Sequence, residues 1–348
     1  MFRAGVIGCG NIARVHARAL KESGCAVLQA FADRNLEKAE AYAGQYGGEE
    51  TRCYTSLEEM LEREALDAVH ICTPHYLHVP MAEKALEKGV HVFLEKPPAI
   101  CLKEFYRLEQ AKDRAKKEVG VCFQNRYNDT TEKLREILES GVLGEVRGAR
   151  AFVTWDRETG YYRDSSWRGS WKTEGGGTLI NQAIHTLDLL VYLLGKPQGA
   201  EASFHNHHLQ QVIEVEDTLE AYIKFPGANA CFYATNAYAD DAPVLLDLVC
   251  RQGRIRMEGE TLEIHKADGS KVWYDFEKKE PAVGKTYWGN SHQACIADFY
   301  ECLMEKKPFR NRLEAVEDTF RLVMELYGSA QYDKIVRKKR GGMPEWIR

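Results

Sequence analysis

Residues 4–13 of the chain read AGVIGCGNIA, and this stretch decides the fold. An apolar run typical of a buried strand leads into the pattern G-x-G-x-x-A, which contains Gly8 and Gly10 and runs through Asn11 and Ile12 into a helical stretch. The first glycine permits a tight turn, and the second lets the backbone approach a pyrophosphate. A tight turn without a ligand is the alternative. The strand, glycines and helix together predict a dinucleotide-binding unit.

Outward from this motif, short runs rich in valine and isoleucine alternate with stretches of helical period, which is typical of β-α-β units and a parallel sheet. The order predicts a doubly wound α/β domain of the Rossmann type over residues 1–122. Strands are expected at 4–7, 27–32, 68–72, 90–94 and 119–123, with helices at about 12–22, from 36, at about 79–88 and up to about 117.

The pattern changes after the last of these strands. A helix is expected near 131–139, followed by long alternating strands at 146–154 and 218–225. The runs at 230–238, 244–250 and 254–257 are joined by short turns, which favours antiparallel pairing between them. Residues 123–348 are therefore predicted to form an α+β domain with an open, mainly antiparallel sheet, whose free face serves a partner subunit or a binding cleft.

Composition narrows the class of protein. The 348 residues are 44% hydrophobic and 28% charged, with a net charge of −5, which gives no electrostatic reason to expect nucleic acid. No apolar run approaches the roughly 20 residues that span a bilayer, and no signal peptide is visible, so a cytoplasmic protein is expected. The ten cysteines lack a Cys-x-x-Cys pair and are expected to stay reduced. The basic run at 337–340 is expected to be a solvated tail.

Asp33 closes the second expected strand, at about the distance from the glycines where a carboxylate accepts hydrogen bonds from the ribose hydroxyls. The same carboxylate would repel a 2′-phosphate, so NAD is expected as the cofactor rather than NADP. Arg34, the next residue, could stack on the adenine or weaken that preference.

Lys96 lies in the sequence Glu95-Lys96-Pro97, directly after an apolar run typical of a central strand. The carboxyl edge of an open α/β sheet is where such domains bind ligands. A lysine there can stabilise the alkoxide that develops as hydride leaves carbon. A solvated surface lysine is the alternative.

A second cluster, GGGTLINQAIH, spans residues 175–185. Three glycines precede an expected helix on which Asn181 and His185 are four residues apart and share a face. Two structural alternatives remain open at this point: Asn181 as a helix cap, and His185 as a satisfied core histidine.

Taken together, the glycine fingerprint, residues 95–97, Trp167-Arg168 and the glycine run resemble the glucose-fructose oxidoreductase, inositol dehydrogenase and rhizopine-catabolism family. The resemblance extends to YWGNSH at residues 287–292 and spans nearly the whole chain. It implies that Lys96 and His185 are the catalytic pair. It also implies a homodimer or homotetramer formed through the open sheet.

The same resemblance implies further contacts with the cofactor. These come from the segments after three Rossmann strands, and Trp167 and Arg168 approach from the second domain. The residues that follow the Rossmann strands are Thr73, Pro74, His78, Glu95, Asn125 and Arg126. Many members carry aspartate where this chain has Asn181, and an amide is neutral and can both donate and accept. Asparagine resembles the version found in some nucleotide-sugar 3-dehydrogenases.

Other polar and aromatic residues lie near these motifs. Tyr161, Tyr162 and Trp171 fall in an expected loop and either line a sugar pocket or pack the core, and Lys172 is a candidate substrate contact. The histidines at 205–208 are expected at an exposed strand end, and no metal site is expected.

The expected reaction is hydride transfer between NAD and a ring hydroxyl of a sugar, an inositol or a sugar derivative. His185 takes the hydroxyl proton and Lys96 polarises the oxygen. One rival is a redox-neutral enzyme that cleaves glycosides with a tightly bound NAD. Another is a regulatory protein that senses the dinucleotide without turnover.

Overall fold

The computed structural model describes residues 1–276 and 291–339, and it divides them into two compact units. The first contains residues 1–133, 172–175, 276 and 291–317, and the second contains residues 134–171, 176–275 and 318–339. Residues 287–290 of the family motif and Arg340 of the basic run lie outside the described residues, as do the side chains of 337–339. The predicted division of the chain between residues 122 and 123 stays a prediction.

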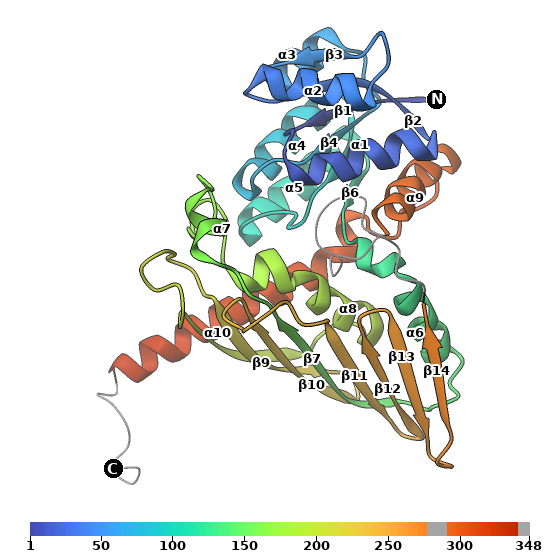
Figure 1. Cartoon of the computed structure of the whole chain (residues 1–348), viewed down its shortest axis with the longest axis vertical. Coiled ribbons are helices and arrows are strands. Elements are labelled where there is room, and N and C mark those ends of the chain that lie inside the picture. The colour runs from blue at the N-terminus through green and yellow to red at the C-terminus, as the bar shows by residue number, and fades with distance from the viewer. Residues whose placement is uncertain (277–290, 340–348) are drawn as a thin grey trace. The chain divides into compact units, whose positions relative to one another are not determined.

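The first unit is built on a parallel sheet with the order β3-β2-β1-β4-β5-β6 (Figure 1). The predicted doubly wound fold is confirmed. Because β1 has β2 on one side and β4 on the other, the connections reverse direction there, and this switch point is where such sheets bind ligands. The strands are β1 (Phe2–Ile7), β2 (Ala26–Ala32), β3 (Arg52–Tyr54), β4 (Ala68–Ile71), β5 (His91–Leu94) and β6 (Val119–Val121).

The helices of this unit are α1 (Asn11–Ser23), α2 (Leu36–Tyr46), α3 (Leu57–Arg63), α4 (His78–Glu87), α5 (Leu102–Ala115) and α9 (His292–Glu305). The late helix α9 packs beside α1 (Figure 1). Phe299 on α9 and Phe309 after it enter the core near β6, where a Cβ added at Gly120 would lie 2.8 Å from the ring of Phe299 and 2.9 Å from that of Phe309. Strand β3 is missing from the sequence prediction because its three residues, Arg52–Tyr54, do not form an apolar run, unlike those of the equally short β6.

The second unit is built on a sheet with the order β14-β13-β12-β11-β7-β10-β9-β8. Every neighbouring pair is antiparallel except β7 with β10, so the predicted mainly antiparallel sheet is confirmed. Its strands are β7 (Val146–Thr154), β8 (Gly199–His205), β9 (Thr218–Phe225), β10 (Ala228–Thr235), β11 (Leu245–Cys250), β12 (Gly253–Glu258), β13 (Thr261–Lys266) and β14 (Lys271–Asp275).

Short helices accompany this sheet, and α10 (Glu317–Lys339) crosses beside it in Figure 1. The others are α7 (Thr159–Arg163), the π-helical turn η3 (Leu179–Ala183) and α8 (Ile184–Leu194), while α6 (Asp129–Glu139) begins in the first unit. The expected loop around Tyr161 and Tyr162 is wrong, because both residues lie in α7.

The predicted antiparallel pairing of β10 with β11 is also wrong. Strand β7 lies between them, parallel to β10 and antiparallel to β11. The connecting residues 236–244 are long enough to pass the end of β7, and Ala242 N–H donates there to the carbonyl oxygen of Thr154, the last residue of β7. The antiparallel pairing of β11 with β12 is confirmed.

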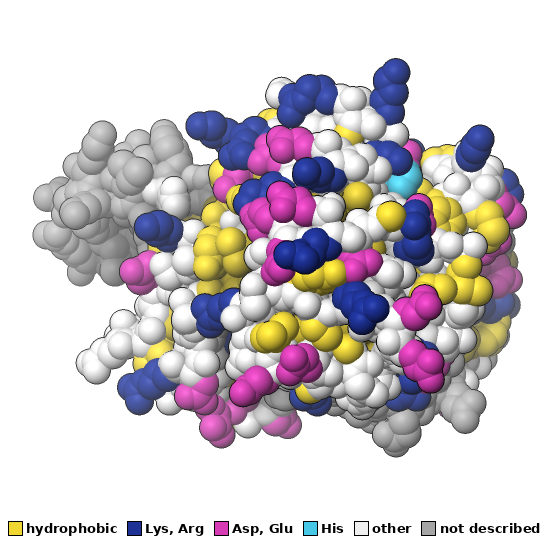
Figure 2. Space-filling model, turned by 90° about the horizontal axis from the view of Figure 1, so that it is seen from above, with side chains coloured by type: hydrophobic (Ala, Val, Ile, Leu, Met, Phe, Trp, Pro, Cys, Tyr) yellow, Lys and Arg dark blue, Asp and Glu magenta, His cyan; other side chains and the backbone are white. Residues whose placement is uncertain are grey.

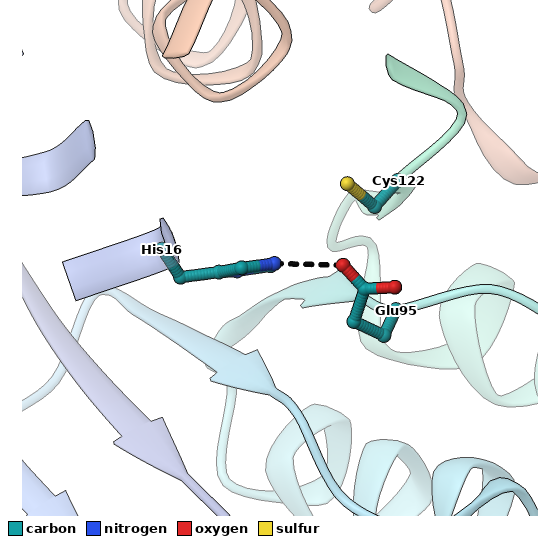
Figure 3. Close-up of side chains that lie close together, drawn as sticks. All are labelled: His16, Glu95 and Cys122. Atoms are coloured by element: carbon teal, nitrogen blue, oxygen red, sulfur yellow. Dashed lines mark hydrogen bonds and ion pairs between the residues drawn. The ribbon is translucent and has the colours of Figure 1, made fainter. Parts of the chain in front are cut away.

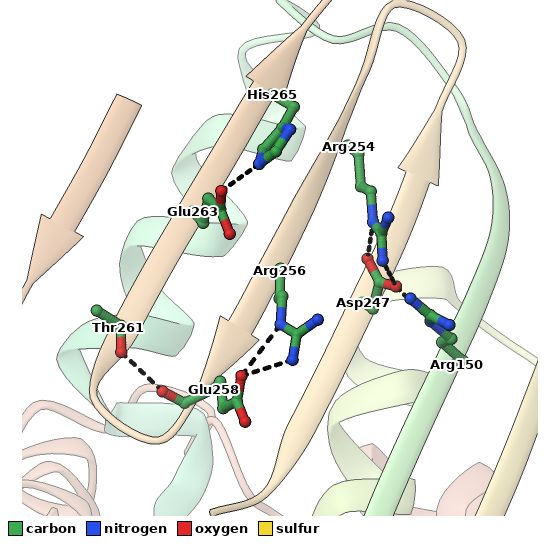
Figure 4. A network of polar contacts seen from close by, with 8 residues as sticks. All are labelled: Arg150, Asp247, Arg254, Arg256, Glu258, Thr261, Glu263 and His265. Carbon is green, nitrogen blue, oxygen red and sulfur yellow. Dashed lines mark hydrogen bonds and ion pairs between the residues drawn. The ribbon is translucent and has the colours of Figure 1, made fainter. Parts of the chain in front are cut away.

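One face of this sheet carries a charged network (Figure 4). Asp247 on β11 is 1% exposed and accepts hydrogen bonds from Arg150 on β7 and Arg254 on β12. Glu263 and His265 pair along β13. The role of the open face in an oligomer stays a prediction.

The outer surface shown in Figure 2 carries basic and acidic side chains side by side, with no area of basic charge alone. A face of this kind does not concentrate positive potential. None of the helices in the described part of the chain has both the length and the apolar character needed to cross a membrane.

Candidate active site

The glycine turn after β1 combines a close contact with an open space. Gly8 has a φ of +91°, and a Cβ there would lie 2.8 Å from the carbonyl oxygen of Cys72 at the end of β4. Gly10 precedes α1, and a Cβ there would meet nothing within 4 Å. No side chain caps the helix start, so the N–H groups of Asn11 and Ile12 can meet a ligand, whereas the Ala13 N–H donates to Gly10 O at 3.1 Å. This cradle fits a pyrophosphate.

Asp33 stands beside the cradle at the end of β2. Its Oδ2 accepts the Cys9 N–H at 2.8 Å and its Oδ1 accepts the Asn35 N–H at 2.9 Å. Each oxygen keeps a further lone pair, so the oriented carboxylate can still accept ribose hydroxyls. The side chain of Arg34 is exposed next to it.

The end of β4 contributes Thr73, Pro74 and His78. The Thr73 hydroxyl oxygen is buried and has no hydrogen-bond partner within the described structure, as expected of a group that awaits a ligand. The His78 ring is fully buried, with Nδ1 2.8 Å from Pro97 O and Nε2 2.9 Å from Thr73 O. Burial lowers the pKa of His78 despite these two carbonyls. His78 therefore ties the β4 loop to the segment that follows β5.

Lys96 and Asn125 lie at the ends of the next two strands. Lys96 is half-buried, its peptide bond to Pro97 is cis, and its N–H donates to Glu95 Oε2 at 3.2 Å. Asn125 follows β6, and its Oδ1 is a second buried oxygen without a partner among the described residues. Arg126 beside it is buried and donates to the carbonyl of Ala315 at 3.2 Å. This bond fixes the segment that follows β6.

Beneath this edge lies a buried polar network (Figure 3). His16 Nε2 lies 2.8 Å from Glu95 Oε1, and the Cys122 sulfur lies within 4.8 Å of both groups. His16 Nδ1 lies 2.9 Å from His70 Nδ1, and His70 Nε2 lies 2.9 Å from the Tyr300 hydroxyl. Of these residues, the sequence analysis selected Glu95 alone. The network could have been suspected from two histidines at positions where apolar residues are expected, His16 on the buried face of α1 and His70 in the otherwise apolar β4.

The network favours an ion pair. Burial works against a charge on His16, but hydrogen bonds to Cys122 and Glu95, together with the Glu95 charge, raise the pKa of His16 to about 9. Burial alone would raise the pKa of Glu95, but the His16 bond and charge hold it well below its ordinary value. Burial and the His16 charge lower the pKa of His70, so that ring is neutral.

The same trio, His16, Glu95 and Cys122, has the spacing of a metal-binding group. Two facts favour the hydrogen-bonded pair instead. The His16 nitrogen and the Glu95 oxygen are 2.8 Å apart and share a proton, and burial raises the pKa of Cys122 well above its ordinary value, so its sulfur remains a thiol.

In the second unit, the glycine run is explained by close packing. A Cβ at Gly176 would lie 2.0 Å from the Tyr327 hydroxyl, and one at Gly177 would lie 1.9 Å from the carbonyl oxygen of Glu216. Neither position can hold a larger residue without moving the backbone or α10.

Glu216 caps the segment that this run introduces. Its carboxylate accepts the N–H groups of Gly177 (2.9 Å) and Leu179 (3.0 Å) and the Tyr327 hydroxyl (2.8 Å). Burial raises the pKa of Glu216 to about 7, against the effect of these hydrogen bonds. Sequence reasoning missed Glu216, although an acid at the entry to an alternating strand was a signal.

The helix expected after the glycine run is present, but its first turn, which contains Asn181, is π-helical and α8 begins only at Ile184. Asn181 is not a helix cap, since Thr178 and Ala183 take those positions. Its Nδ2 lies 3.5 Å from the Tyr161 hydroxyl, and His185 follows on α8, half-buried. Single π-helical turns inside helices occur frequently at functional sites.

Trp167 and Arg168 lie close to the same tyrosine. The Arg168 guanidinium is 4.3 Å from the ring centroid of Tyr161 and 4.8 Å from that of Trp167. Trp171 packs against Phe204 and Tyr327, which favours the core-packing alternative for that residue. Lys172 is exposed and belongs to the first unit.

His205 ends β8 and is 42% exposed, as predicted. Its nearest ion-pair partner is Glu220, at 3.3 Å.

The structure thus gathers the candidate residues in two groups. One lies at the carboxyl edge of the parallel sheet and includes Lys96, and the other surrounds the π-helical turn and includes His185. These two residues belong to different units, so their convergence on one substrate stays a prediction.

A dinucleotide cradle with a lysine at the same sheet edge defines the class as a nucleotide-binding oxidoreductase. Residues 2–123 match the model of an oxidoreductase family with an NAD-binding Rossmann fold, and residues 131–256 match the C-terminal domain model of the same family. The chain belongs to the glucose-fructose oxidoreductase, inositol dehydrogenase and rhizopine-catabolism family, and the resemblance of the motifs is confirmed.

Individual relatives are similar over part of their length. The D-glucoside 3-dehydrogenase of Escherichia coli K12 is 32% identical over 61% of this chain and 58% of that enzyme. The inositol 2-dehydrogenase of Rhizobium meliloti 1021 is 30% identical over 56% of this chain and 55% of that enzyme. The chain therefore spans little more than half the length of these curated relatives.

Among solved structures, the WlbA dehydrogenase of Bordetella pertussis, in complex with NADH and UDP-GlcNAcA, matches with a TM-score of 0.81 at 27% identity. That match covers 95% of this chain and 96% of the other.

The close packing of the glycine run predicts a large effect of one methyl group. Gly177→Ala should lower the free energy of unfolding by about 3 kcal/mol or more, because the new Cβ would overlap a backbone oxygen. Gly199→Ala is the matched control, since a Cβ there meets nothing within 4 Å. Urea denaturation of both variants measures the difference, and equal stability would contradict the packing.

The His16 ion pair predicts a pH dependence of stability. The pKa of His16 is raised from 6.5 to about 9, so the folded protein holds this proton more tightly than the unfolded chain does. The stabilisation is complete below about pH 6.5, is lost as pH rises through 9, and corresponds to about 3 kcal/mol. Urea unfolding of wild type and of the double variant His16→Gln/Glu95→Gln, which lacks both partners of the pair, should show a decline across this window in wild type that the variant lacks.

Proposed function

We propose that the chain is an NAD-dependent dehydrogenase that acts on a CH–OH group of a sugar, an inositol or a sugar derivative. The observation that carries the proposal is the half-buried Lys96 after β5, at the same carboxyl edge of the sheet as a glycine turn with room for a pyrophosphate. The names of the relatives, a glucoside dehydrogenase and an inositol dehydrogenase, support the substrate class.

NAD supplies the acceptor for the hydride when it is bound. Gly8, Gly10, Asn11 and Ile12 hold the pyrophosphate through backbone groups, and the Asp33 carboxylate holds the adenosine ribose. Thr73 and Asn125 offer buried oxygens that lack partners in the described structure, and these suit polar atoms of the nicotinamide half.

Further residues of the site have assisting roles in the proposal. Pro74 and Glu95 complete the contacts with the nicotinamide half, and Arg34 takes the adenine side. Both ring nitrogens of His78 face backbone carbonyls, so we assign it to positioning the loop. Trp167 and Arg168 approach the cofactor from the second unit.

His185 and Lys96 do the acid–base work in the proposed reaction. The His185 ring takes the proton of the substrate hydroxyl, while the Lys96 ammonium stabilises the negative charge that develops on the oxygen. The C–H bond breaks with its electron pair leaving as hydride, and the C–O bond becomes a carbonyl. Asn181 and Lys172 bind substrate hydroxyls.

A nucleotide-sugar is the second candidate substrate. Asn181 supplies a neutral amide where an acid would add negative charge, and the nearby Arg168 has a buried Nε with no hydrogen-bond partner in the described ranges. This combination suits a substrate with anionic groups. The Bordetella pertussis relative, whose complex contains UDP-GlcNAcA, supports this candidate.

Two readouts separate these candidates from the redox-neutral alternative. Inositols, free sugars, glycosides and nucleotide-sugars are incubated with NAD and with NADP while the nicotinamide absorbance is followed. Net NADH formation identifies a dehydrogenase. Release of an aglycone without an absorbance change identifies a glycoside-cleaving enzyme.

We also propose a cytoplasmic homodimer or homotetramer that uses the open face of the second sheet. None of the ten cysteines forms a disulfide, which suits a reducing compartment. Sedimentation of the purified chain tests the assembly.

The catalytic assignment predicts a selective loss of turnover. Lys96→Met should reduce kcat by at least about a hundredfold, because the developing oxyanion loses its charge partner, while the Kd for NAD changes little. Lys103→Met is the matched control, since Lys103 is exposed on α5. Unchanged turnover in Lys96→Met would remove the assignment.

The cofactor assignment predicts a change in selectivity. Asp33→Ser should remove the repulsion of a 2′-phosphate and shift the ratio of NAD to NADP affinity towards NADP by about tenfold or more. Calorimetric titration with both cofactors measures this ratio. If the variant keeps the wild-type ratio, Asp33 does not bind the ribose.

A further inference from the structure

A chain of buried polar groups connects α9 with the catalytic lysine. It runs from the Tyr300 hydroxyl to His70 at 2.9 Å, from His70 to His16 at 2.9 Å, and from His16 to Glu95 at 2.8 Å. The other oxygen of Glu95 accepts the N–H of Lys96 at 3.2 Å. These contacts lie within the first unit.

From this geometry we propose that His16 is a positioning residue, whose imidazolium holds Glu95 as a carboxylate beside the nicotinamide half of the cofactor site. In that position the carboxylate favours the oxidised cofactor, whose nicotinamide ring is cationic, over the neutral reduced form. The inference rests on the proposed function, because it requires NAD at this edge of the sheet.

The sheet order indicates which half of the cofactor Glu95 meets. Asp33 lies at the end of β2, on one side of the switch point between β1 and β4. A dinucleotide binds across that point, so a nicotinamide opposite the adenosine lies towards β4, β5 and β6. Glu95 directly follows β5.

The proton arrangement along the chain follows from one charged ring. A doubly protonated His16 donates through Nε2 to Glu95 and through Nδ1 to His70 Nδ1. His70 must then carry its proton on Nε2, from which it donates to the Tyr300 hydroxyl. Each of the three contacts from Tyr300 to Glu95 thus receives one proton.

Other ionisable groups on the surrounding elements lie near the Glu95 carboxylate, and His16 is the cationic side chain that hydrogen-bonds to it. Burial, with the charges of His16 and Lys96, lowers the pKa of His292 to about 4, so that ring is neutral. The surrounding groups are His16 on α1, His70 on β4, Cys72 and His78 after β4, Lys96 after β5, Cys122 after β6 and His292 on α9.

Removing the ring charge therefore has a specific consequence. In His16→Gln the buried Glu95 loses its hydrogen-bonded cation, and burial then raises the pKa of its carboxyl towards neutrality. Glu95 would be neutral at the acid end of the neutral range and charged at the alkaline end. The preference for oxidised over reduced cofactor should follow that titration.

The test is calorimetric titration of the full chain with NAD⁺ and with NADH between about pH 6 and pH 8. Wild type, His16→Gln and the double variant His16→Gln/Glu95→Gln are compared. The ratio of the two affinities should be flat in wild type, rise about tenfold with pH in His16→Gln, and be flat again in the double variant. A ratio in folded His16→Gln as flat as in wild type would overturn the proposal, as would a pH dependence retained by the double variant.

A second measurement needs no variant to fold. In wild type labelled with ¹⁵N-histidine, both ring nitrogens of His16 should show imidazolium shifts up to about pH 8. A neutral His16 ring at pH 7 would overturn the proposal. These readouts do not depend on turnover, so an active Lys96→Met enzyme would remove the proposed chemistry and leave the role of His16 standing.

Discussion

A carboxylate can remain inside a protein only where donors compensate its charge, and the candidate site depends on two such carboxylates. Glu95 lies below the carboxyl edge of the parallel sheet, and Glu216 lies at the start of the π-helical turn. Each one belongs to a different unit of the chain. Glu95 directly precedes Lys96. Glu216 bonds to the segment that leads to Asn181 and His185.

The two carboxylates are compensated differently. Glu95 faces a full positive charge on His16, and its pKa is held well below the ordinary value. Glu216 receives two backbone N–H groups and a phenol, which are dipoles without net charge, and burial raises its pKa to about 7. The first group is therefore a fixed charge at neutral pH, whereas the second can exchange a proton there.

The sequence predicted what local periodicity determines. The alternation of apolar runs and helices gave the parallel sheet, and the glycine fingerprint with Asp33 gave the cradle. It could not predict that β7 separates β10 from β11, because strand order depends on contacts between distant residues. The π-helical turn at Asn181 was also beyond a periodic pattern, since it spans only five residues.

The buried partners of the site were hidden for the same reason. His16 is 79 residues from Glu95, and Tyr300 is 230 residues from His70. Glu216 meets Gly177 from 39 positions away. A sequence motif identifies side chains that are expected to contact ligands. The groups that orient these side chains lie far away in the sequence and come into contact only in the folded protein.

Both carboxylates bond to the backbone rather than to the side chains proposed for catalysis. Glu95 accepts the N–H of Lys96, and Glu216 accepts the N–H groups of Gly177 and Leu179. Such bonds fix the position of the main chain without using the ammonium or the imidazole. A direct ion pair from Glu95 to the Lys96 ammonium would orient that group but would also neutralise the charge needed at the developing oxyanion. Support through the backbone therefore positions the two segments through bonds that involve neither the Lys96 ammonium nor the His185 ring.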